Sequence, residues 1–375
     1  LQFIPNNDDI IYLNAATDPW TNEFNTKTAQ TIDSQIGVNN YDIGHNFNTT
    51  GGGNAGCLDC VCLSISQNST HKGRGYTGLA SPVGDPFYVD YVAHEMGHQF
   101  GGYHTQSNSS CRSGNGATEV EPGSGSTIMG YAGICSANVQ NQSDDYFHYV
   151  NIRDIVTSIN YGNGSGCAEI ISSGNGGPTA DAGANYTIPI STPFKLEGVG
   201  TDPDDSGITY NWDQNDPESP NSNSAPTGTR TSGPMFRSFN PVTVPHRYFP
   251  NLTAIRNNTN PTWEVLPTRS RNMEFSFIVR DNNSNSGCTA SDLMSVTTNQ
   301  NAGPFLVQSP NTGVSWTGGT TETVTWDVAG TTNAPVSCAN VDILLSTDGG
   351  LTYPITIASN VPNDGNQDIT VPNNP

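Results

Sequence analysis

The feature that most constrains this chain is an uninterrupted HExxHxxGxxH run from His94 to His104. Histidines four residues apart on a helix point the same way, so His94 and His98 are expected to reach one zinc ion. Gly101 can adopt a positive φ, turn the chain, and bring His104 back as a third ligand. Glu95 can take a proton from a zinc-bound water without being a ligand itself. Three protein ligands and one open position are typical of a catalytic zinc site.

The alternative is that this pattern arose by chance on an ordinary helix. HExxH alone occurs on many helices, but five fixed positions in this spacing should coincide on the order of once in ten million sites or fewer. The helix also has boundaries, because Asp85 and Pro86 predict its N-cap and first position and Gly101–Gly102 predict its end. We therefore expect a catalytic zinc helix.

A second motif lies downstream, where the run Ser126–Tyr131 contains Met129. With the zinc motif, this run resembles the metzincins, zinc endopeptidases that carry a methionine turn below the metal. The resemblance implies that Met129 is the hydrophobic floor beneath the three histidines, a role close to ordinary core packing. Tyr131 matches the Met-x-Tyr form of astacin-like and serralysin-like members, in which the tyrosine hydroxyl lies near the zinc and can stabilise the oxyanion.

The sequence HEMGHQFGGYH, and Gly53–Gly56 followed by Cys62, are similar to the reprolysin (adamalysin, M12B) branch of the metzincins. The chain therefore resembles a bacterial-type reprolysin-like metzincin that keeps the tyrosine. This resemblance implies an α+β metzincin catalytic domain, a mixed twisted sheet plus the active-site helix, over residues 1–171. In metzincins the last strand before the zinc helix is an edge strand that pairs with an extended substrate, and residues 51–62 are the candidate. Reprolysin-like domains usually begin with a further strand and helix, so we expect an upstream N-terminal segment, either still associated after nicking or absent.

The composition of the chain excludes some classes of binding partner and indicates where the protein is located. The chain has 375 residues, enough for two or three domains, and a formal net charge of −21, which disfavours nucleic acid and anionic membranes as partners. No apolar run approaches the roughly 18 residues that span a membrane. The lack of a signal peptide or initiator Met predicts a processed or excised chain. Eight cysteines and few lysines predict a secreted, extracellular protein with disulfides.

The cysteines of the first part of the chain are predicted to pair. Cys57, Cys60 and Cys62 include one CxxC, but no second CxxC follows, so disulfides are favoured over a structural zinc site. Many pairings are possible. We predict Cys111–Cys135, which would bracket the loop between the zinc helix and the methionine turn.

Further elements are predicted from apolar spacing and turn residues. Strands are expected at 10–13 and 41–47, and helices at 25–36, 143–149 and 151–160. Asn151 with Asp154 is the expected cap of the last helix. His45 is expected to be structural rather than a ligand, because three histidines already supply the site. Tyr146 and Phe147 are interpreted as core residues, with a wall of the specificity pocket as the alternative.

The second half of the chain predicts β-modules. Residues 172–178 read as a linker, and short strands among Gly, Pro and Asn turns over 179–300 predict an immunoglobulin-like β-sandwich. Residues 301–375 predict a second β-sandwich with a hairpin at 346–350. Its shortness predicts further strands beyond the last residue.

One acidic run in the first sandwich has a further interpretation. The residues TDPDD, followed by TYNW, resemble PKD-like and cadherin-like immunoglobulin-type modules of bacterial secreted proteins. Asp202, Asp204 and Asp205 in this run offer oxygen ligands to Ca²⁺. A solvated acidic turn is the alternative.

These observations predict a secreted zinc metalloendopeptidase that acts on proteins or peptides. Glu95 would deprotonate the water and pass the proton to the leaving amine, and Tyr131 would help to hold the oxyanion. The β-modules would bind substrate, a cell surface or a secretion partner. The competing hypothesis is a non-catalytic cell-surface adhesin that works through its sandwiches. A missing histidine or Glu95 would favour that hypothesis, and none is missing.

Overall fold

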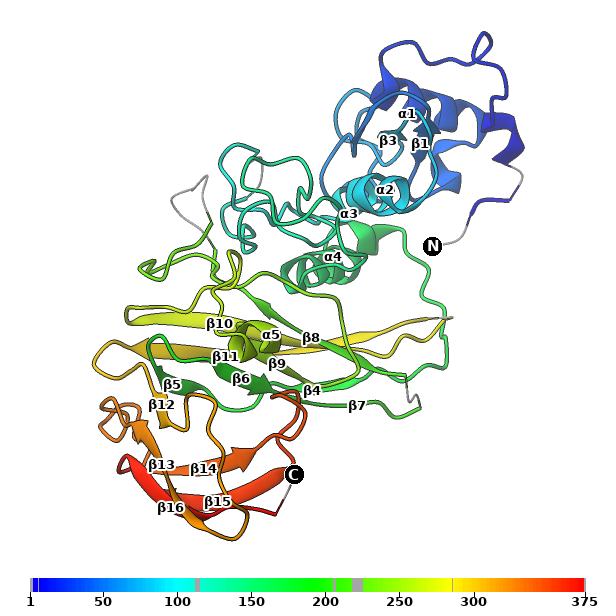
Figure 1. Ribbon diagram of the computed structural model, residues 1–375. Coiled ribbons are helices and arrows are strands. Elements are labelled where there is room, and N and C mark those ends of the chain that lie inside the picture. The colour runs from blue at the N-terminus through cyan, green and yellow to red at the C-terminus, as the bar shows by residue number, and fades with distance from the viewer. Residues whose placement is uncertain are drawn as a thin grey trace.

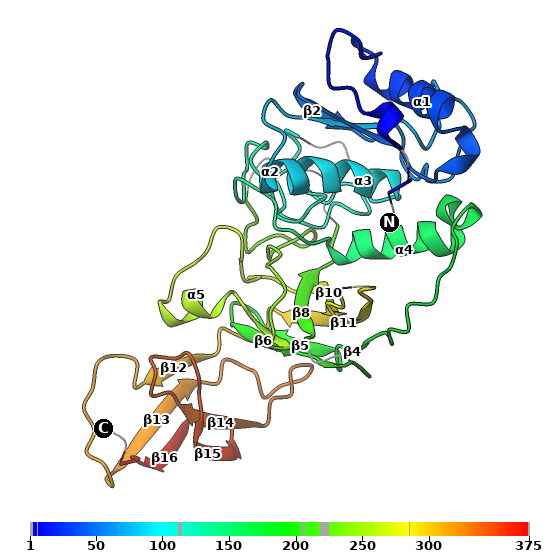
Figure 2. The same ribbon diagram turned by 90° about the vertical axis from the view of Figure 1, so that its right-hand side faces the viewer.

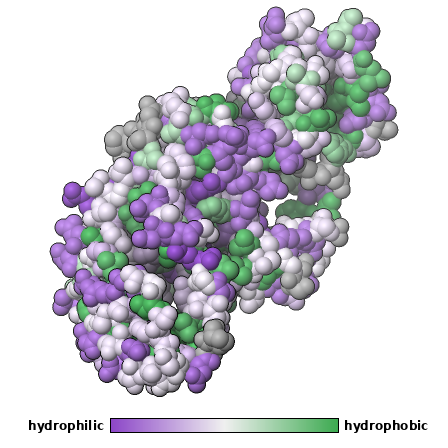
Figure 3. Space-filling model, in the orientation of Figure 1, coloured by the Kyte–Doolittle hydropathy of each residue, from purple (hydrophilic) through white to green (hydrophobic). Residues whose placement is uncertain are grey.

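The computed structural model describes residues 3–5, 7–111, 115–204, 207–217, 225–284 and 286–373. An N-terminal part, a β-sandwich and a smaller β-module follow one another along the length of the molecule (Figure 1, Figure 2). The predicted fold class, an α+β domain followed by all-β immunoglobulin-like modules, is confirmed. No helix within the described ranges is both long and apolar enough to cross a membrane. The face drawn in Figure 3 is largely hydrophilic, with apolar side chains in scattered groups.

The N-terminal sheet has three strands in the order β1-β3-β2. Their bounds are His45–Asn48 for β1, Gly52–Asn54 for β2 and Gly75–Gly78 for β3. The central strand β3 runs parallel to β1 and antiparallel to β2. β2 is therefore an edge strand, as predicted for residues 51–62. It is not the last strand before the zinc helix, because β3 comes between them in the chain.

Helices pack on this sheet and carry the zinc motif. The predicted helix at 25–36 is confirmed as α1 (Phe24–Gln35), which packs on β1 and β3, and α3 also packs on β3. The other helical segments of this part are η1 (Asn7–Ile10), η2 (Val38–Asn40), α2 (Asp85–Phe87), the π-helical η3 (Tyr88–Ala93), α3 (His94–Gln99), α4 (Tyr149–Tyr161) and η4 (Asn163–Gly166).

Two of the predicted elements are absent. Residues 10–13 form no strand: η1 ends at Ile10, and Ile11 and Leu13 are 58% and 96% exposed. Residues 143–148 are not helical, because their backbone bonds to a distant segment instead, with Asp144 N–H donating to the Ser126 carbonyl at 2.7 Å. Such tertiary bonds override a weak local preference.

Helix α4 agrees with the prediction for 151–160 but begins earlier. Its N-cap is His148, whose side chain accepts a hydrogen bond from the Val150 N–H, so the cap expected at Asn151 is wrong. Gly162 ends the helix. The side chain of Asn151 is buried and donates to the Tyr103 carbonyl at 2.7 Å, which joins α4 to the chain next to the third histidine.

The β-sandwich contains a four-stranded sheet in the order β5-β11-β10-β8 and the pairs β4-β7 and β6-β9. Aromatic side chains fill its core, among them Trp212, Phe249 and Phe275. The bounds are β4 Thr179–Asp181, β5 Tyr186–Pro189, β6 Phe194–Glu197, β7 Val199–Thr201, β8 Thr209–Gln214, β9 His246–Phe249, α5 Leu252–Arg256, β10 Arg271–Arg280 and β11 Thr289–Asn299.

The smaller β-module has sheets β12-β13-β16 and β14-β15 around Val324, Trp326 and Ile369. The predicted hairpin at 346–350 lies in the connection between the antiparallel strands β14 and β15. The bounds are β12 Leu306–Ser309, β13 Thr321–Asp327, β14 Asn340–Leu345, β15 Ile355–Pro362 and β16 Asn366–Thr370.

Candidate active site

The zinc-motif helix is formed by α2, η3 and α3, which follow one another without a break. Its N-cap is Gly84, with φ 84°, one residue before the predicted Asp85, and no side chain caps it. Pro86 lies in the first turn, where its missing N–H costs nothing. The π-helical stretch immediately precedes His94, as π-bulges frequently do at functional sites.

The end of this helix brings the third histidine back to the first two. α3 ends at Gln99, and Gly101 has φ 94°, the left-handed conformation that the motif predicts. The Gly102 N–H donates to the Gly97 carbonyl at 2.8 Å and closes the turn. The chain therefore reverses, and His104 faces the side of α3 that carries the other two histidines.

The three histidines converge on one point. His104 Nε2 lies 3.1 Å from His94 Nε2 and 2.9 Å from His98 Nε2. Among the described residues, these three form the one group of three or more His, Cys, Asp or Glu side chains placed to share a metal ion. Ligand nitrogens at the corners of a tetrahedral zinc site are about 3.3 Å apart, close to the spacing observed here.

The hydrogen bonds of the Nδ1 atoms determine whether the Nε2 atoms of His94 and His98 can bind a metal. His94 Nδ1 donates to the Ile128 carbonyl at 2.7 Å, and His98 Nδ1 donates to the Gly102 carbonyl at 2.6 Å. Each Nε2 therefore carries a lone pair directed at the shared point, as metal ligation requires. Burial, and then repulsion from the neighbouring histidine, lower the pKa of His94 to about 4 and that of His98 to about 3. The side chains thus fit a zinc ion.

The Glu95 side chain extends from the zinc helix to the edge strand β2. Burial raises the pKa of its carboxyl to about 7, while a hydrogen bond from the Ala55 backbone N–H acts in the opposite direction. A Cβ at Gly53 would lie 2.6 Å from Glu95 Oε1, so the carboxylate packs directly on the backbone of β2. A divalent cation bound by the histidines would lower this pKa through its charge.

Met129 packs against the zinc helix, and Tyr131 lies beside two of the three histidines. Met129 is fully buried, and a Cβ at Gly97 would lie 2.6 Å from its sulfur, so the methionine packs closely against α3. The Tyr131 ring lies 4.5 Å from the His104 ring and 5.6 Å from the His94 ring, measured between centroids. The structure brings the three histidines, Glu95 and Tyr131 together along one cleft.

These side chains open into a cleft of about 410 Å³. One wall is the edge strand and the loop after it, and the other is the helix and the methionine turn. Its lining residues are Gly53, Asn54, Ala55, Gly56, Cys57, Leu58, His94, Glu95, His98, Tyr103, His104 and Tyr131. Tyr146 and Phe147 are not among them. Tyr146 is buried, so the interpretation as a core residue is the one that fits.

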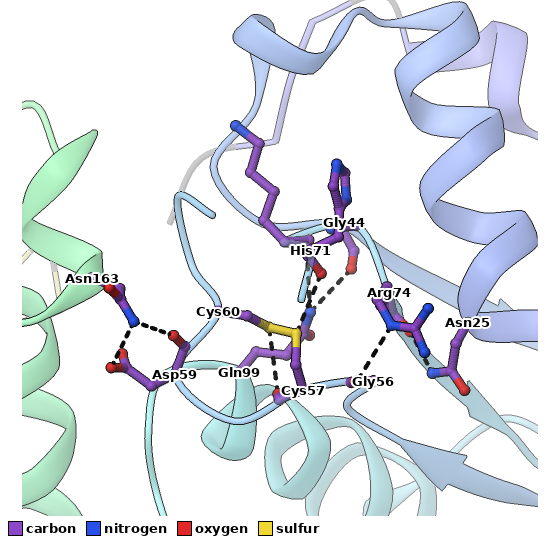
Figure 4. Close-up of a disulfide and its surroundings, with 12 residues drawn as sticks. Asn25, Gly44, Gly56, Cys57, Asp59, Cys60, His71, Arg74, Gln99 and Asn163 are labelled. Carbon is purple, nitrogen blue, oxygen red and sulfur yellow. Dashed lines mark hydrogen bonds between the residues drawn. A yellow bond between two sulfur atoms is a disulfide. The ribbon is translucent and has the colours of Figure 1, made fainter. Parts of the chain in front are cut away.

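The loop after β2 is fastened to the zinc helix (Figure 4). Cys57 and Cys60 form a disulfide, so the CxxC is a bridge rather than half of a metal site. The Asp59 N–H donates to the His98 carbonyl, and the Cys60 N–H donates to the Gln99 carbonyl, both at 3.0 Å. One wall of the cleft is thereby joined to the helix that carries two of the histidines.

Two further disulfides brace the domain. Cys111–Cys135 is present as predicted, and Cys62–Cys167 joins the cleft loop to the segment after α4. Cys288 and Cys338 are unpaired. His45 is structural, as expected: its Nδ1 bonds to Gln99 Oε1 at 2.9 Å and its Nε2 to Thr77 Oγ1 at 2.6 Å.

Sequence reasoning missed the residues that hold the site in place. Glu121, almost fully buried, accepts hydrogen bonds from Thr105 Oγ1 at 2.6 Å and Ser126 N–H at 3.0 Å. Gly53 allows the close approach of Glu95 to β2. An acidic residue in a polar loop and a glycine in a glycine run carry no local signal of these roles.

The calcium prediction gains no support. Asp204 accepts a hydrogen bond from the Gly176 N–H at 2.8 Å, as expected for a residue that shapes a turn. Asp205 lies outside the described residues.

Three converging histidines with an adjacent glutamate and a buried methionine turn are typical of one group of zinc metallopeptidases. Residues 1–162 match the model of the metallo-peptidase family M12B, reprolysin-like. Over these residues the chain is thus similar to the reprolysin-like M12B metallopeptidases, the branch that the zinc motif indicated.

Part of the chain has a weak likeness to a solved structure. The match to the solution structure of the PKD domain of human KIAA0319 has 14% sequence identity. It covers 35% of this chain and 92% of the chain in that structure. Its TM-score of 0.17 is too low to carry an argument. No curated protein matches the chain.

Proposed function

We propose that this protein is a secreted zinc metalloendopeptidase that cleaves extended protein or peptide substrates. The observation that carries the proposal is the meeting of three imidazole Nε2 atoms and the Glu95 carboxylate in one cleft beside an edge strand. The M12B family match supports the peptidase class. The three disulfides are consistent with an extracellular location.

His94, His98 and His104 would hold the zinc, with Met129 packed beneath them. When bound, zinc supplies Lewis-acid polarisation of the scissile carbonyl and lowers the pKa of water. Glu95 accepts a proton from the attacking water and passes it to the leaving amine.

Tyr131 would act on the carbonyl oxygen of the substrate. Its ring packs against His104, which places the phenol beside the histidine cluster. The hydroxyl would donate a hydrogen bond as negative charge develops on that oxygen.

The edge strand β2 would bind the substrate backbone. Within the described ranges β2 pairs only with β3, and residues 53–58 line the cleft. An extended peptide can add to such an edge through main-chain hydrogen bonds, which give affinity largely independent of the substrate side chains.

We also propose the division of the chain into four parts. The catalytic domain covers 1–171, a linker 172–178, an immunoglobulin-like sandwich 179–300 and a second sandwich 301–375. Separate cores around Phe275 and Trp326 support two β-modules. The modules would engage substrate, a cell surface or a secretion partner.

Casein cleavage with and without a zinc chelator tests this proposal. We expect cleavage that the chelator abolishes and added zinc restores. Glu95→Gln should keep zinc, because the side chain is not a ligand, yet lose at least about 10²-fold in rate. His104→Ala should instead lose the metal. Near-parental cleavage by Glu95→Gln would contradict the mechanism.

A further inference from the structure

We propose that the first β-sandwich positions the zinc site, through a clamp formed by Arg237 and Ser238 on the segment that carries the methionine turn. The inference rests on the proposed function. It makes the sandwich a working part of the catalytic centre as well as an appended binding module. Arg237 is a positioning residue in this account, because it touches neither substrate nor metal ligands.

The segment in question has little structure of its own. Between the end of α3 at Gln99 and the start of α4 at Tyr149, the described residues form no helix and no strand. This stretch nevertheless carries His104, Met129 and Tyr131. A long connection without regular structure inside a compact domain must be held by tertiary contacts. The source of those contacts therefore determines where the third ligand and the methionine turn lie.

The outer contacts of this stretch come from the sandwich. The Arg237 guanidinium bonds to Gln140 Oε1 and lies 3.8 Å from an Asp144 carboxylate oxygen. Asn240 Nδ2 donates to the same carboxylate at 3.2 Å. Beside them, Ser126 Oγ donates to the Ser238 carbonyl at 3.2 Å. Both Asp144 and Ser126 are thus bound to one short run of the sandwich, residues 237–240.

The two clamped residues also bond to each other and lead to the first zinc ligand. The Asp144 N–H donates to the Ser126 carbonyl at 2.7 Å, and the Ile128 N–H donates to the Tyr146 carbonyl at 3.1 Å. The Ile128 carbonyl in turn accepts the hydrogen bond from His94 Nδ1 at 2.7 Å. A short path of hydrogen bonds therefore joins the sandwich surface to the orientation of His94.

A second branch leads to the third ligand through Glu121. This buried carboxylate accepts hydrogen bonds from Thr127 Oγ1 at 2.5 Å and from Thr105 Oγ1 at 2.6 Å. The Thr105 N–H donates to the Met129 carbonyl at 3.1 Å. Because Thr105 follows His104 directly, a displacement of the methionine-turn segment would also move His104.

The contact between the two parts is extensive enough to act in this way. All of residues 210–214 in β8 are buried, although the sandwich core takes only alternate side chains of a strand. The opposite face meets the N-terminal part, where Asp213 Oδ2 accepts the Tyr149 N–H at 3.3 Å. Arg280 Nη2 donates to the Phe147 carbonyl at 3.1 Å, and the Trp263 ring packs on Gly123.

The test uses the full chain and measures zinc affinity separately from catalysis. Arg237→Ala removes the contacts to Gln140 and Asp144. Arg237 is not one of the apolar residues that form the sandwich core, so that core is left intact. We expect the Kd for zinc, measured by competition with a chelator, to rise about 3- to 30-fold, and kcat/KM for a peptide to fall by a similar factor. Lys195→Ala is the matched control, because it removes an ion pair with Glu197 elsewhere on the same sandwich. It should change neither quantity.

Exchanging the charges of Arg237 and Asp144 distinguishes a positioning role of Arg237 from a general loss of folding. Arg237→Asp and Asp144→Arg should each weaken zinc binding, and the double variant should recover at least part of the loss. A folded double variant without recovery would overturn the assignment to Arg237. So would an Arg237→Ala chain whose zinc affinity and kcat/KM stay within twofold of the parent. Zinc affinity tests the clamp even if the parent cleaves no peptide, an outcome that would refute only the proposed function.

Discussion

Replacing Gly53 with alanine would test how the edge strand holds the general base. A Cβ at residue 53 would lie 2.6 Å from Glu95 Oε1 and 2.8 Å from its Cγ, whereas ordinary contacts begin at 3.4 Å. The carboxylate would therefore have to move by roughly 0.8 Å. Gly53 does not have a positive φ, so alanine suits the backbone and should not destabilise the fold.

The expected loss follows from that displacement. Glu95 has to receive a proton from water and deliver it to the leaving amine, and both transfers depend on its position. A misplacement of about 1 Å can cost on the order of 10²-fold in rate, so we expect kcat to fall roughly 10- to 100-fold. KM and zinc content should stay near the parental values, because the histidines and the free edge of β2 are unchanged.

The assay is steady-state cleavage of a quenched fluorescent peptide, with zinc per chain measured on the same preparation. Gly51→Ala is the matched control, because a Cβ there meets nothing within 4 Å. A Gly53→Ala chain with full zinc and a kcat within twofold of the parent would refute the reasoning. An equal loss in Gly51→Ala would also refute it.

Two further predictions concern Tyr131 and a disulfide. Tyr131→Phe should lower kcat and kcat/KM about equally, by roughly 10- to 10³-fold, because the hydroxyl acts only as charge develops. Steady-state kinetics decide this, and an unchanged kcat would mean that the ring only packs against His104. Cys62→Ser/Cys167→Ser should remove roughly 4 kcal/mol of stability, because the bridge closes a loop of 105 residues. Calorimetry should show a melting temperature lower by roughly 10 °C, and an unchanged melting temperature would contradict this account.

Short-range patterns predicted well wherever local geometry determines the structure. The helix at 25–36, the helix at 151–160 and the left-handed Gly101 depend on residues a few positions apart, and the structure contains all three. The predicted strand at 10–13 and the predicted helix at 143–149 are absent for a different reason. Their apolar spacing is compatible with more than one conformation, and contacts with distant residues decide between them.

The residues proposed to carry the chemistry can be recognised in the sequence alone. The spacing of His94, His98 and His104, with Glu95 beside the first, depends on the pitch of one helix and one glycine turn, so it can be read without knowledge of the fold. The disulfide Cys111–Cys135 was likewise predicted from the loop that it brackets.

The contacts that hold these residues in place form only in the folded protein. The carbonyl of Ile128 accepts the hydrogen bond that orients His94, and the absence of a side chain at Gly53 allows Glu95 to approach β2. Residues 237–240 form hydrogen bonds with the methionine-turn segment. Ser126 and Ser238 are 112 positions apart, and each is an ordinary polar residue in an irregular stretch. No periodicity or motif connects residues that meet only after two domains have folded and packed together, so these contacts leave no trace in the local sequence.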